Sequence, residues 1–431
     1  MSHLTPVMFS SHTARMRIAI RLWLISLLSV LAGAANAASP ALLSHWVQLA
    51  PGGGAEARIV LQGNVCPPAI VDGANMPMRV RAAADKNFPV LLCAVTLPAG
   101  AKHLSILGTD MPVPVADPQR IIVLGDTGCR IKGSAVQACN DPAKWEFPEI
   151  AAAAAKLKPD LTIHVGDYLY REGPCPGVDS GCTGSPWGDN WNAWAADFFT
   201  PAQPLLGASA WVVVRGNHED CTRGGPGWLR LLGPLAVDTA NCVSHLAPYP
   251  VPLKPMTLIV MDDADASDVL APSDQVAVYR GDFAAIGRLA PAPSWLVMHR
   301  PIWGVVKGPM GMVLGGNSTM MAAVDRTGIA PNISLLLAGH IHTFEAINYE
   351  KGAPPQILAG EGGDLLDPAP ADLTGQSVGA MKITSGLSLP GYGFLLFTRA
   401  GNIWNVDVRA ADGSHERSCE FASGHIACAA K

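Results

Sequence analysis

The chain has 431 residues, of which 49% are hydrophobic and 15% are charged, and its formal net charge is −5. This composition excludes global disorder, which requires low hydrophobicity and high net charge. It also argues against nucleic acid as a partner, because there is no basic excess to neutralise phosphates. We therefore expect a large, loop-rich globular protein with turns at many of its 44 glycines and 36 prolines.

The N-terminal residues are expected to be an export signal that is removed. Three arginines between positions 15 and 21 precede the apolar stretch 22–31, and an Ala-Asn-Ala pattern ends at Ala37. This order is typical of a signal peptide with its cleavage site. A membrane anchor is the alternative, but the stretch is shorter than the roughly 20 residues that a spanning helix needs. We predict a signal peptide over residues 1–37, no stable membrane span after cleavage, and a secreted or periplasmic protein.

Cysteine usage agrees with export. There are ten cysteines, an even number, and no C-x-x-C pair occurs. In exported proteins an even number of cysteines usually forms disulfide bonds. The alternative is that some of the cysteines bind zinc. The sequence does not fix which cysteines pair, and we take pairing between near neighbours as the working prediction: Cys66–Cys93, Cys129–Cys139, Cys175–Cys182, Cys221–Cys242 and Cys419–Cys428.

After the predicted signal peptide, the pattern of expected strands and helices changes near residue 115. Residues 38–115 contain short strand-like runs separated by Gly and Pro, which predicts a small β-sandwich-like N-terminal domain. In residues 116–431 short apolar runs alternate with helical stretches, as in a layered α/β domain. Helices are expected over 149–157, 187–199 and 282–289. Buried strands are expected over 120–124, 161–165, 211–214, 258–261, 295–298 and 333–337, with two more over 392–397 and 402–406.

Polar residues capable of binding metals follow five of these strands. They are Asp126 after 120–124, Asp167 and Tyr170 after 161–165, Asn217 after 211–214, His299 after 295–298, and His340 and His342 after 333–337. Ligands gather beyond the carboxyl ends of strands in open α/β sheets. Carboxylate, phenolate, amide and imidazole groups without thiolate favour iron, manganese or zinc over copper(I). Seven ligands are more than one tetrahedral zinc ion can take. Two ions roughly 3.5–4 Å apart, bridged by one carboxylate, fit this number of ligands.

These motifs, in this order, resemble those of the calcineurin-like metallophosphoesterases, and among them the purple acid phosphatases. The matching segments are Asp126-Thr-Gly128, Gly166-Asp167-Tyr-Leu-Tyr170, Gly216-Asn217-His218-Glu219, Leu296-Val-Met-His299 and Gly339-His340-Ile-His342. Gly128 stands where most of the wider superfamily has histidine, and Tyr170 is the compensating ligand, as in the purple acid phosphatases. The resemblance implies a layered α/β/β/α metallophosphoesterase sandwich, here preceded by the small all-β domain.

The same resemblance implies roles for the individual residues. Asp167 would bridge two ions. The first ion, ferric in that family, would be bound by Asp126, Tyr170 and His342. The second, expected to be Fe, Zn or Mn, would be bound by Asn217, His299 and His340. His218 resembles the histidine that contacts phosphate and protonates the leaving oxygen. The alternative role for His218 is to orient one of the metal-binding side chains through a hydrogen bond.

We therefore expect an exported dinuclear metal-dependent phosphoric ester hydrolase of the acid phosphatase type, acting on small phosphate monoesters by attack of a metal-bound hydroxide on phosphorus. One alternative is a phosphodiesterase or a nucleotide or phospholipid hydrolase with the same metal site. Another is a non-catalytic, metal-stabilised binding protein. No histidine lies between His299 and His340, unlike in plant-type members, so Arg300, Trp303 or Lys307 are alternative substrate anchors.

Overall fold

The computed structural model describes residues 1, 3, 41–177, 180–235, 241–308, 313–350 and 352–429. From Ala41 onward the chain forms one compact unit. The predicted signal peptide, apart from residues 1 and 3, lies outside the described residues. Among the described residues, no helix has both the length and the apolar character needed to cross a bilayer.

Two large β-sheets form the centre of this unit. Within the described residues, the first has eleven strands, in the spatial order β27 (His425–Cys428), β26 (His415–Ala422), β25 (Ile403–Ala410), β24 (Gly393–Ala400), β9 (Arg120–Leu124), β12 (Leu161–His164), β13 (Ala210–Val213), β1 (Ala41–Leu49), β2 (Ala55–Gln62), β6 (Leu91–Thr96) and β5 (Arg79–Ala82). The second has eight, in the order β14 (Tyr249–Pro252), β15 (Thr257–Val260), β16 (Ser294–Val297), β19 (Ile333–Ala338), β21 (Gln356–Ala359), β20 (Phe344–Tyr349), β23 (Met381–Leu389) and β22 (Ser377–Val378).

Smaller sheets complete the β structure. A four-stranded sheet has the order β4 (Ala74–Pro77), β3 (Pro68–Val71), β7 (Leu104–Ile106) and β8 (Thr109–Met111). Two hairpins pair β10 (Ile131–Lys132) with β11 (Ala135–Val136) and β17 (Val306–Lys307) with β18 (Val313–Leu314).

Side-chain alternation along the central strands produces the layers. In β9, Ile121 and Val123 lie in the core shared by the two large sheets, whereas Ile122 and Leu124 lie in the core on the outer face of the first sheet. Successive side chains of a strand point to opposite faces, so a strand covered on both sides is apolar throughout. This explains the continuous apolar runs of the sequence.

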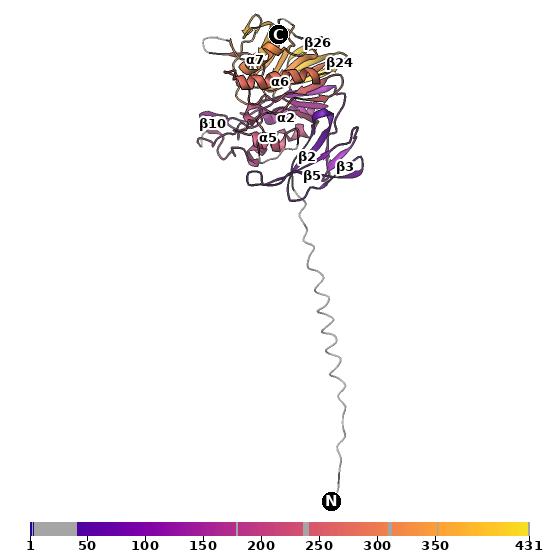
Figure 1. Cartoon of the computed structure of the whole chain (residues 1–431). Helices are drawn as coiled ribbons and strands as arrows, with labels where there is room; N and C mark the ends of the chain where they lie inside the picture. The colour runs from indigo at the N-terminus through magenta and orange to yellow at the C-terminus, as the bar shows by residue number, and fades with distance from the viewer. Residues whose placement is uncertain are drawn as a thin grey trace. The chain divides into compact units, whose positions relative to one another are not determined.

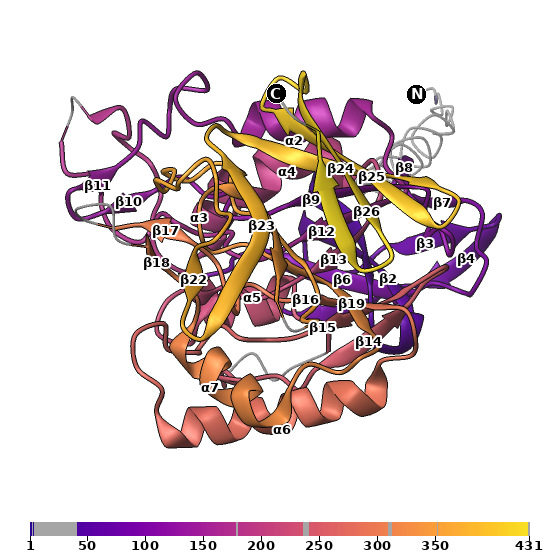
Figure 2. The same ribbon diagram turned by 90° about the horizontal axis from the view of Figure 1, so that it is seen from above.

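Helices cover the outer faces of both sheets. The core outside the first sheet includes residues of α2 (Phe147–Lys156), α3 (Trp191–Trp194), α4 (Thr200–Leu206) and α5 (Gly225–Leu231). The core outside the second includes residues of α6 (Ser273–Leu289) and α7 (Ser318–Thr327). Figure 1 shows α6 and α7 on one side of the strands and α2 on the other, and Figure 2 shows the same layers from above. The predicted α/β/β/α sandwich is confirmed.

The N-terminal segment is rich in β structure, as expected, but the predicted boundary near residue 115 does not divide the structure. β1 pairs in parallel with β13, where Val47 lies opposite Ala210. β2, β6 and β5 then continue the first large sheet, and residues from Ala41 onward cluster as one unit. The predicted N-terminal β structure is therefore present, and from Ala41 onward it belongs to the same compact unit as the rest of the chain. No local sequence pattern reveals parallel pairing between distant segments.

The predicted helices exist, with shifted bounds. The stretch 149–157 corresponds to α2. The stretch 187–199 is helical only from α3 onward, because Asn190 caps that helix by accepting from the amide of Ala193 at 3.1 Å. The chain then passes through a π turn, Ala195–Phe199, into α4. The stretch 282–289 is the second half of α6, while α4, α5 and α7 lie outside the predicted helical stretches.

All five predicted disulfides are confirmed, and none of the described cysteines is free. Three of them close loops that follow β9, β12 and β13, the strands that precede the first three motifs. These are Cys129–Cys139, Cys175–Cys182 and Cys221–Cys242.

Candidate metal centre

The predicted ligands follow strands that end at one rim of the molecule. β9, β12 and β13 are parallel neighbours in the first sheet, and β16 and β19 are parallel neighbours in the second. Parallel neighbours end on the same side, so the residues after them meet. The structure brings all seven predicted ligands into one connected group, which includes contacts between residues of both sheets.

The hydroxyl of Tyr170 is the centre of the first cluster of donor atoms. Tyr170 Oη lies 3.1 Å from Asp126 Oδ1, 2.9 Å from Asp167 Oδ2 and 3.1 Å from His342 Nε2. His342 Nε2 and Asp126 Oδ1 are 3.4 Å apart. Four side chains from three strand ends thus converge on one small volume.

A second cluster lies next to the first and shares Asp167 with it. His299 Nε2 lies 3.0 Å from Asn217 Oδ1 and 3.2 Å from Asp167 Oδ2. Ligand atoms of Asp167, His299 and His340 all lie within 4.8 Å of one another. Asp167 therefore contacts members of both clusters.

The backbone at the rim is strained where it carries these ligands. Asp126, Asp167 and His340 have φ values of 56°, 59° and 71°, in the left-handed region that residues other than glycine rarely adopt. Such conformations persist only where the surroundings enforce them, and they are concentrated at functional sites. Three of the seven predicted ligands share this feature.

Close packing explains two of the motif glycines. A Cβ atom on Gly216 would overlap the Oδ1 and the main-chain nitrogen of Asp167. A Cβ atom on Gly128 would lie 2.7 Å from Cδ2 of Tyr170. The tyrosine ring thus leaves no room for a side chain at position 128, where most of the superfamily carries histidine.

Five of the seven predicted ligands are buried, Asn217 and His340 are half-buried, and the group is electrostatically suited to cations. Burial, with the charges of Asp167 and Asp126, holds the pKa of Tyr170 well above its usual value. Against the effect of burial, Asp167 raises the pKa of His299 to about 9. In the same way Asp126 raises the pKa of His342 to about 10, again against burial. Protons are thus drawn to histidines beside carboxylates, and bound cations would replace that positive charge. The residues present therefore fit two cations of the iron, manganese or zinc type.

His218 lies against this group without being part of either cluster. Its ring centroid is 3.8 Å from that of Tyr170. Its Nε2 lies 3.9 Å from Asp167 Oδ2, and its amide donates to Asp167 Oδ1 at 2.8 Å. Burial lowers the pKa of His218 to about 4.

Three carboxylate–arginine pairs surround the site, and the motif analysis identified none of them as pairs. Each pair touches one histidine. They are Glu172–Arg223, with Glu172 Oε1 at 2.7 Å from His218 Nδ1; Asp268–Arg300, with Asp268 Oδ2 at 3.2 Å from His340 Nε2; and Asp364–Arg130, with Asp364 Oδ2 at 3.4 Å from His342 Nδ1. Metal-binding histidines usually donate their second N–H to such a group, which sets the ring orientation.

One of these residues could have been found from the sequence. Asp364 follows β21 through Gly360-Glu-Gly-Gly, which repeats the pattern of a strand, a glycine and an aspartate seen in the motifs. The strand itself was not predicted. Glu172 and Asp268 lie in loops where no periodic pattern singles out an acid.

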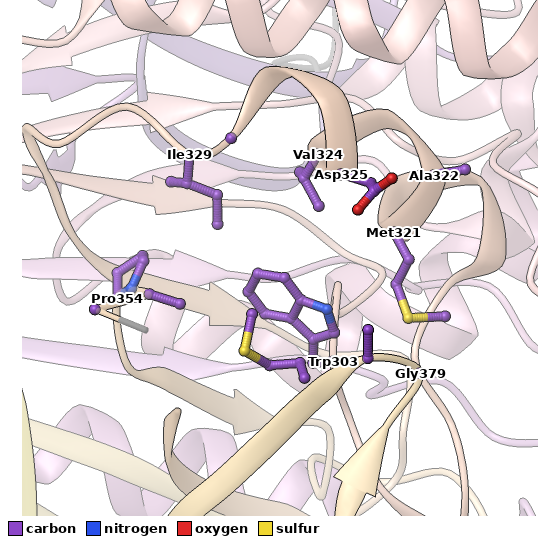
Figure 3. Close-up of a pocket in the computed structure, with 13 residues that line it drawn as sticks. Trp303, Met321, Ala322, Val324, Asp325, Ile329, Pro354 and Gly379 are labelled. Carbon is purple, nitrogen blue, oxygen red and sulfur yellow. The ribbon is translucent and has the colours of Figure 1, made fainter. Parts of the chain in front are cut away.

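The alternative substrate anchors have different surroundings. Arg300 Nη1 lies 3.1 Å from His340 Nε2, so Arg300 is at the site. Lys307 is exposed on β17. Trp303 instead lines a cavity of about 610 Å³ together with Met321, Val324 and Ile329. Figure 3 shows these side chains around the cavity, and no predicted metal ligand lines it.

Comparison with known proteins agrees with this geometry. A model of the calcineurin-like phosphoesterase family matches residues 119–344, more than half of the chain. No curated protein sequence matches the chain. The fold is similar to that of the purple acid phosphatase PPD1 isolated from yellow lupin (Lupinus luteus) seeds, with a TM-score of 0.55 and 12% identity over 89% of this chain and 74% of that one.

A second similar structure is that of PhoD, with a TM-score of 0.52 and 11% identity over 90% of this chain and 92% of that one. At these identities the two structures show the fold, while the family model covers all five motifs of the site, from Asp126 to His342. The chain belongs to the calcineurin-like phosphoesterase family.

Proposed function

We propose that the chain is an exported, dinuclear metal-dependent phosphoesterase of the acid phosphatase type, acting on small phosphate monoesters. The position of Asp167 carries this proposal. Its Oδ2 lies 2.9 Å from Tyr170 Oη in one cluster and 3.2 Å from His299 Nε2 in the other. A carboxylate shared between two sets of ligands suits the two-cation mechanism of phosphoester displacement.

Each cluster would hold one cation. When bound, the two cations supply a water of lowered pKa and neutralise charge on the phosphoryl oxygens. Asp167 would be common to both, one cation being held by Asp126, Tyr170 and His342 and the other by Asn217, His299 and His340.

His218 is the proton donor in this proposal. The oxygen of a water molecule forms the new bond to phosphorus, and the bond from phosphorus to the leaving oxygen breaks with its electron pair on that oxygen. His218 gives that oxygen a proton, so that an alcohol leaves, and the proton released by the water restores the histidine. Burial keeps the pKa of His218 low in the substrate-free protein, and the negative charge of a bound phosphoryl group favours its protonated form.

The proposal is tested with p-nitrophenyl phosphate and its bis ester, before and after chelation. We expect the monoester to be the better substrate, its hydrolysis to stop when cations are removed, and activity to return when they are restored. Full activity in protein shown by elemental analysis to hold no metal would contradict the proposal.

The same assay separates the alternatives. Faster hydrolysis of the bis ester would favour a phosphodiesterase with the same site. Hydrolysis of neither ester by metal-loaded protein would favour a binding protein stabilised by metal.

For the first cation we propose iron(III), on the basis of the tyrosine ligand. The resemblance to purple acid phosphatases implies a visible colour from charge transfer between the Tyr170 phenolate and iron. Tyr170→Phe is expected to abolish the visible absorption band, which a spectrum measured beside the metal content would show. A colourless wild-type protein with zinc in both sites would contradict iron without affecting the proposed hydrolysis.

We also propose that the protein is secreted or periplasmic. Its five disulfides support this, because such bonds persist in oxidising compartments. The sequence pattern of residues 1–37 supports it independently.

A further inference from the structure

The cavity that Trp303 lines has no part in the proposed function. It has a volume of about 610 Å³ and is bounded by the loop after β16, the second half of α7, the loop between β20 and β21, and the turn between β22 and β23. Pockets that bind small organic molecules have volumes of roughly 300–1,000 Å³. The cavity therefore has the size of a ligand site, and no predicted metal ligand lines it.

Trp303 forms a fixed aromatic wall of this cavity. The residue is buried, and its carbonyl accepts hydrogen bonds from Gln356 Nε2 at 3.0 Å and from the hydroxyl of Tyr349. The ring of Tyr349 lies 5.2 Å from the indole, centroid to centroid. Figure 3 shows the indole between Pro354 on one side and Met321 on the other. Because the indole is already held in place, a ligand that lies against it pays little to order it.

The wall beside Trp303 is apolar and closely packed. Gly379, in the turn between β22 and β23, has a φ of 57°, and a Cβ atom there would lie 3.1 Å from Sδ of Met321. The turn therefore packs directly against the thioether of Met321. Val324 and Ile329 continue the apolar lining along α7 and the loop after it. Thioether and aliphatic groups adapt to apolar ligands of varied shape, so these walls suit an apolar or aromatic body.

The charge at this cavity is of one sign. Among the described residues that line it, Asp325 is the only charged one, and it is exposed. Asp325 forms no ion pair with any basic side chain in the part of the chain that the structure describes. It lies in the last turn of α7, where the backbone carbonyls add partial negative charge. Both the carboxylate and the helix end therefore attract a cation to this edge of the cavity.

We infer that this cavity binds an organic cation, an ammonium group carried on an apolar or aromatic body. The ammonium group lies near the carboxylate of Asp325, and the body lies along the indole of Trp303. Opposite charge and an aromatic face both favour a cation here. An anion would be repelled by Asp325, and a neutral molecule would gain only the apolar contacts. The inference goes beyond the proposed hydrolysis and is independent of it, because no predicted metal ligand takes part.

The experiment uses three probes with the same phenylbutyl body and different charge. They are phenylbutylammonium, phenylbutanol and phenylbutyrate, and isothermal titration calorimetry on the purified chain measures the Kd of each. We expect the ammonium compound to bind about 5-fold more tightly than the alcohol, because it adds one charge interaction near the surface. Phenylbutyrate is expected to bind more weakly than the alcohol.

Three variants locate the site and separate charge from shape. Asp325→Asn should weaken binding of phenylbutylammonium about 5-fold, to the level of the alcohol, and should leave binding of the alcohol unchanged. Ala322→Phe adds a ring at the half-buried lining position 322 and should weaken binding of both at least about 10-fold by filling the cavity. The control is Asp274→Asn, because Asp274 is an exposed acid of α6 that does not line the cavity, and it should change nothing.

Several results would overturn the inference. Equal Kd values for the ammonium compound and the alcohol, or wild-type affinity in Asp325→Asn, would remove the role of charge, and tighter binding of phenylbutyrate would reverse it. Ammonium binding that persists in folded Ala322→Phe would place the ligand elsewhere. A dimer seen by light scattering and lost in that variant would assign the cavity to a second copy of the chain. If Ala322→Phe does not fold, as circular dichroism would show, Ala353→Phe fills the cavity from another wall.

Failure of the proposed function leaves this test intact. A chain that hydrolyses no phosphate ester still gives the three Kd values, which decide the inference alone. Conversely, a chain that hydrolyses p-nitrophenyl phosphate and shows no preference for phenylbutylammonium keeps its proposed function and loses only the cation site.

Discussion

Asp167→Ala is expected to release both cations and to lower the hydrolysis of p-nitrophenyl phosphate by about 10⁴-fold, the scale seen when a group on which a whole site depends is removed. Asp167 contacts Tyr170 in one cluster and His299 in the other, and it also accepts from the amide of His218. Its loss therefore leaves both clusters incomplete. Elemental analysis and steady-state kinetics on the purified variant would measure the two effects.

The control for this variant is Asp274→Ala. Asp274 lies exposed in the first turn of α6, far in sequence from every motif. The Asp274→Ala variant should keep both cations and wild-type kinetics. Normal metal content and rate in Asp167→Ala would contradict the shared role of this carboxylate.

Gly216→Ala is expected to have nearly as large an effect although it adds one methyl group. The new Cβ atom would overlap Asp167 Oδ1 and the main-chain nitrogen of that residue. The φ of Gly216 is −95°, so space and not backbone conformation is the constraint. Because a displacement of about 1 Å at a catalytic group can cost 10²-fold in rate, we expect kcat to fall by at least about 100-fold. Kinetics and metal analysis measure this change.

A glycine in open surroundings provides the comparison for Gly216. Gly281 lies in α6, and apart from its chain neighbours and the adjacent backbone of the helix no atom lies within 4 Å of a Cβ atom built there. Gly281→Ala should keep full activity and raise the free energy of unfolding by about 0.5–1 kcal/mol, because alanine favours helix. Equal activity in the two alanine variants would show that Gly216 is not under the steric constraint described.

Much of the fold and of the candidate site could be predicted because each depends on local pattern. Buried strands such as β9 and β12 are apolar on both faces, so they are visible as continuous runs. The predicted metal ligands follow directly after these strands, so that predicting a strand also locates Asp126 and Asp167. The disulfides agree with the near-neighbour prediction because each joins a cysteine to the next one in the sequence.

The parts of the fold and of the site that could not be predicted depend on contacts between segments that are distant in the sequence. The pairing of β1 with β13 joins Val47 to Ala210, and no periodicity in either segment identifies its partner. The carboxylate–arginine pairs pose the same difficulty. Asp268 and Arg300 lie in different loops and become neighbours only when β15 and β16 are paired. A charged loop residue carries no sign of its partner in the sequence.

Three of the five disulfides lie at the loops that surround His218. Arg130 and Lys132 lie inside the ring closed by Cys129–Cys139, and Arg223 lies inside that closed by Cys221–Cys242. Glu172 lies three residues before the ring closed by Cys175–Cys182. Covalent closure removes chain entropy from a loop before any ligand arrives. Oxidative maturation therefore preorganises the charged side chains, so that little further ordering is left for the moment when a substrate enters.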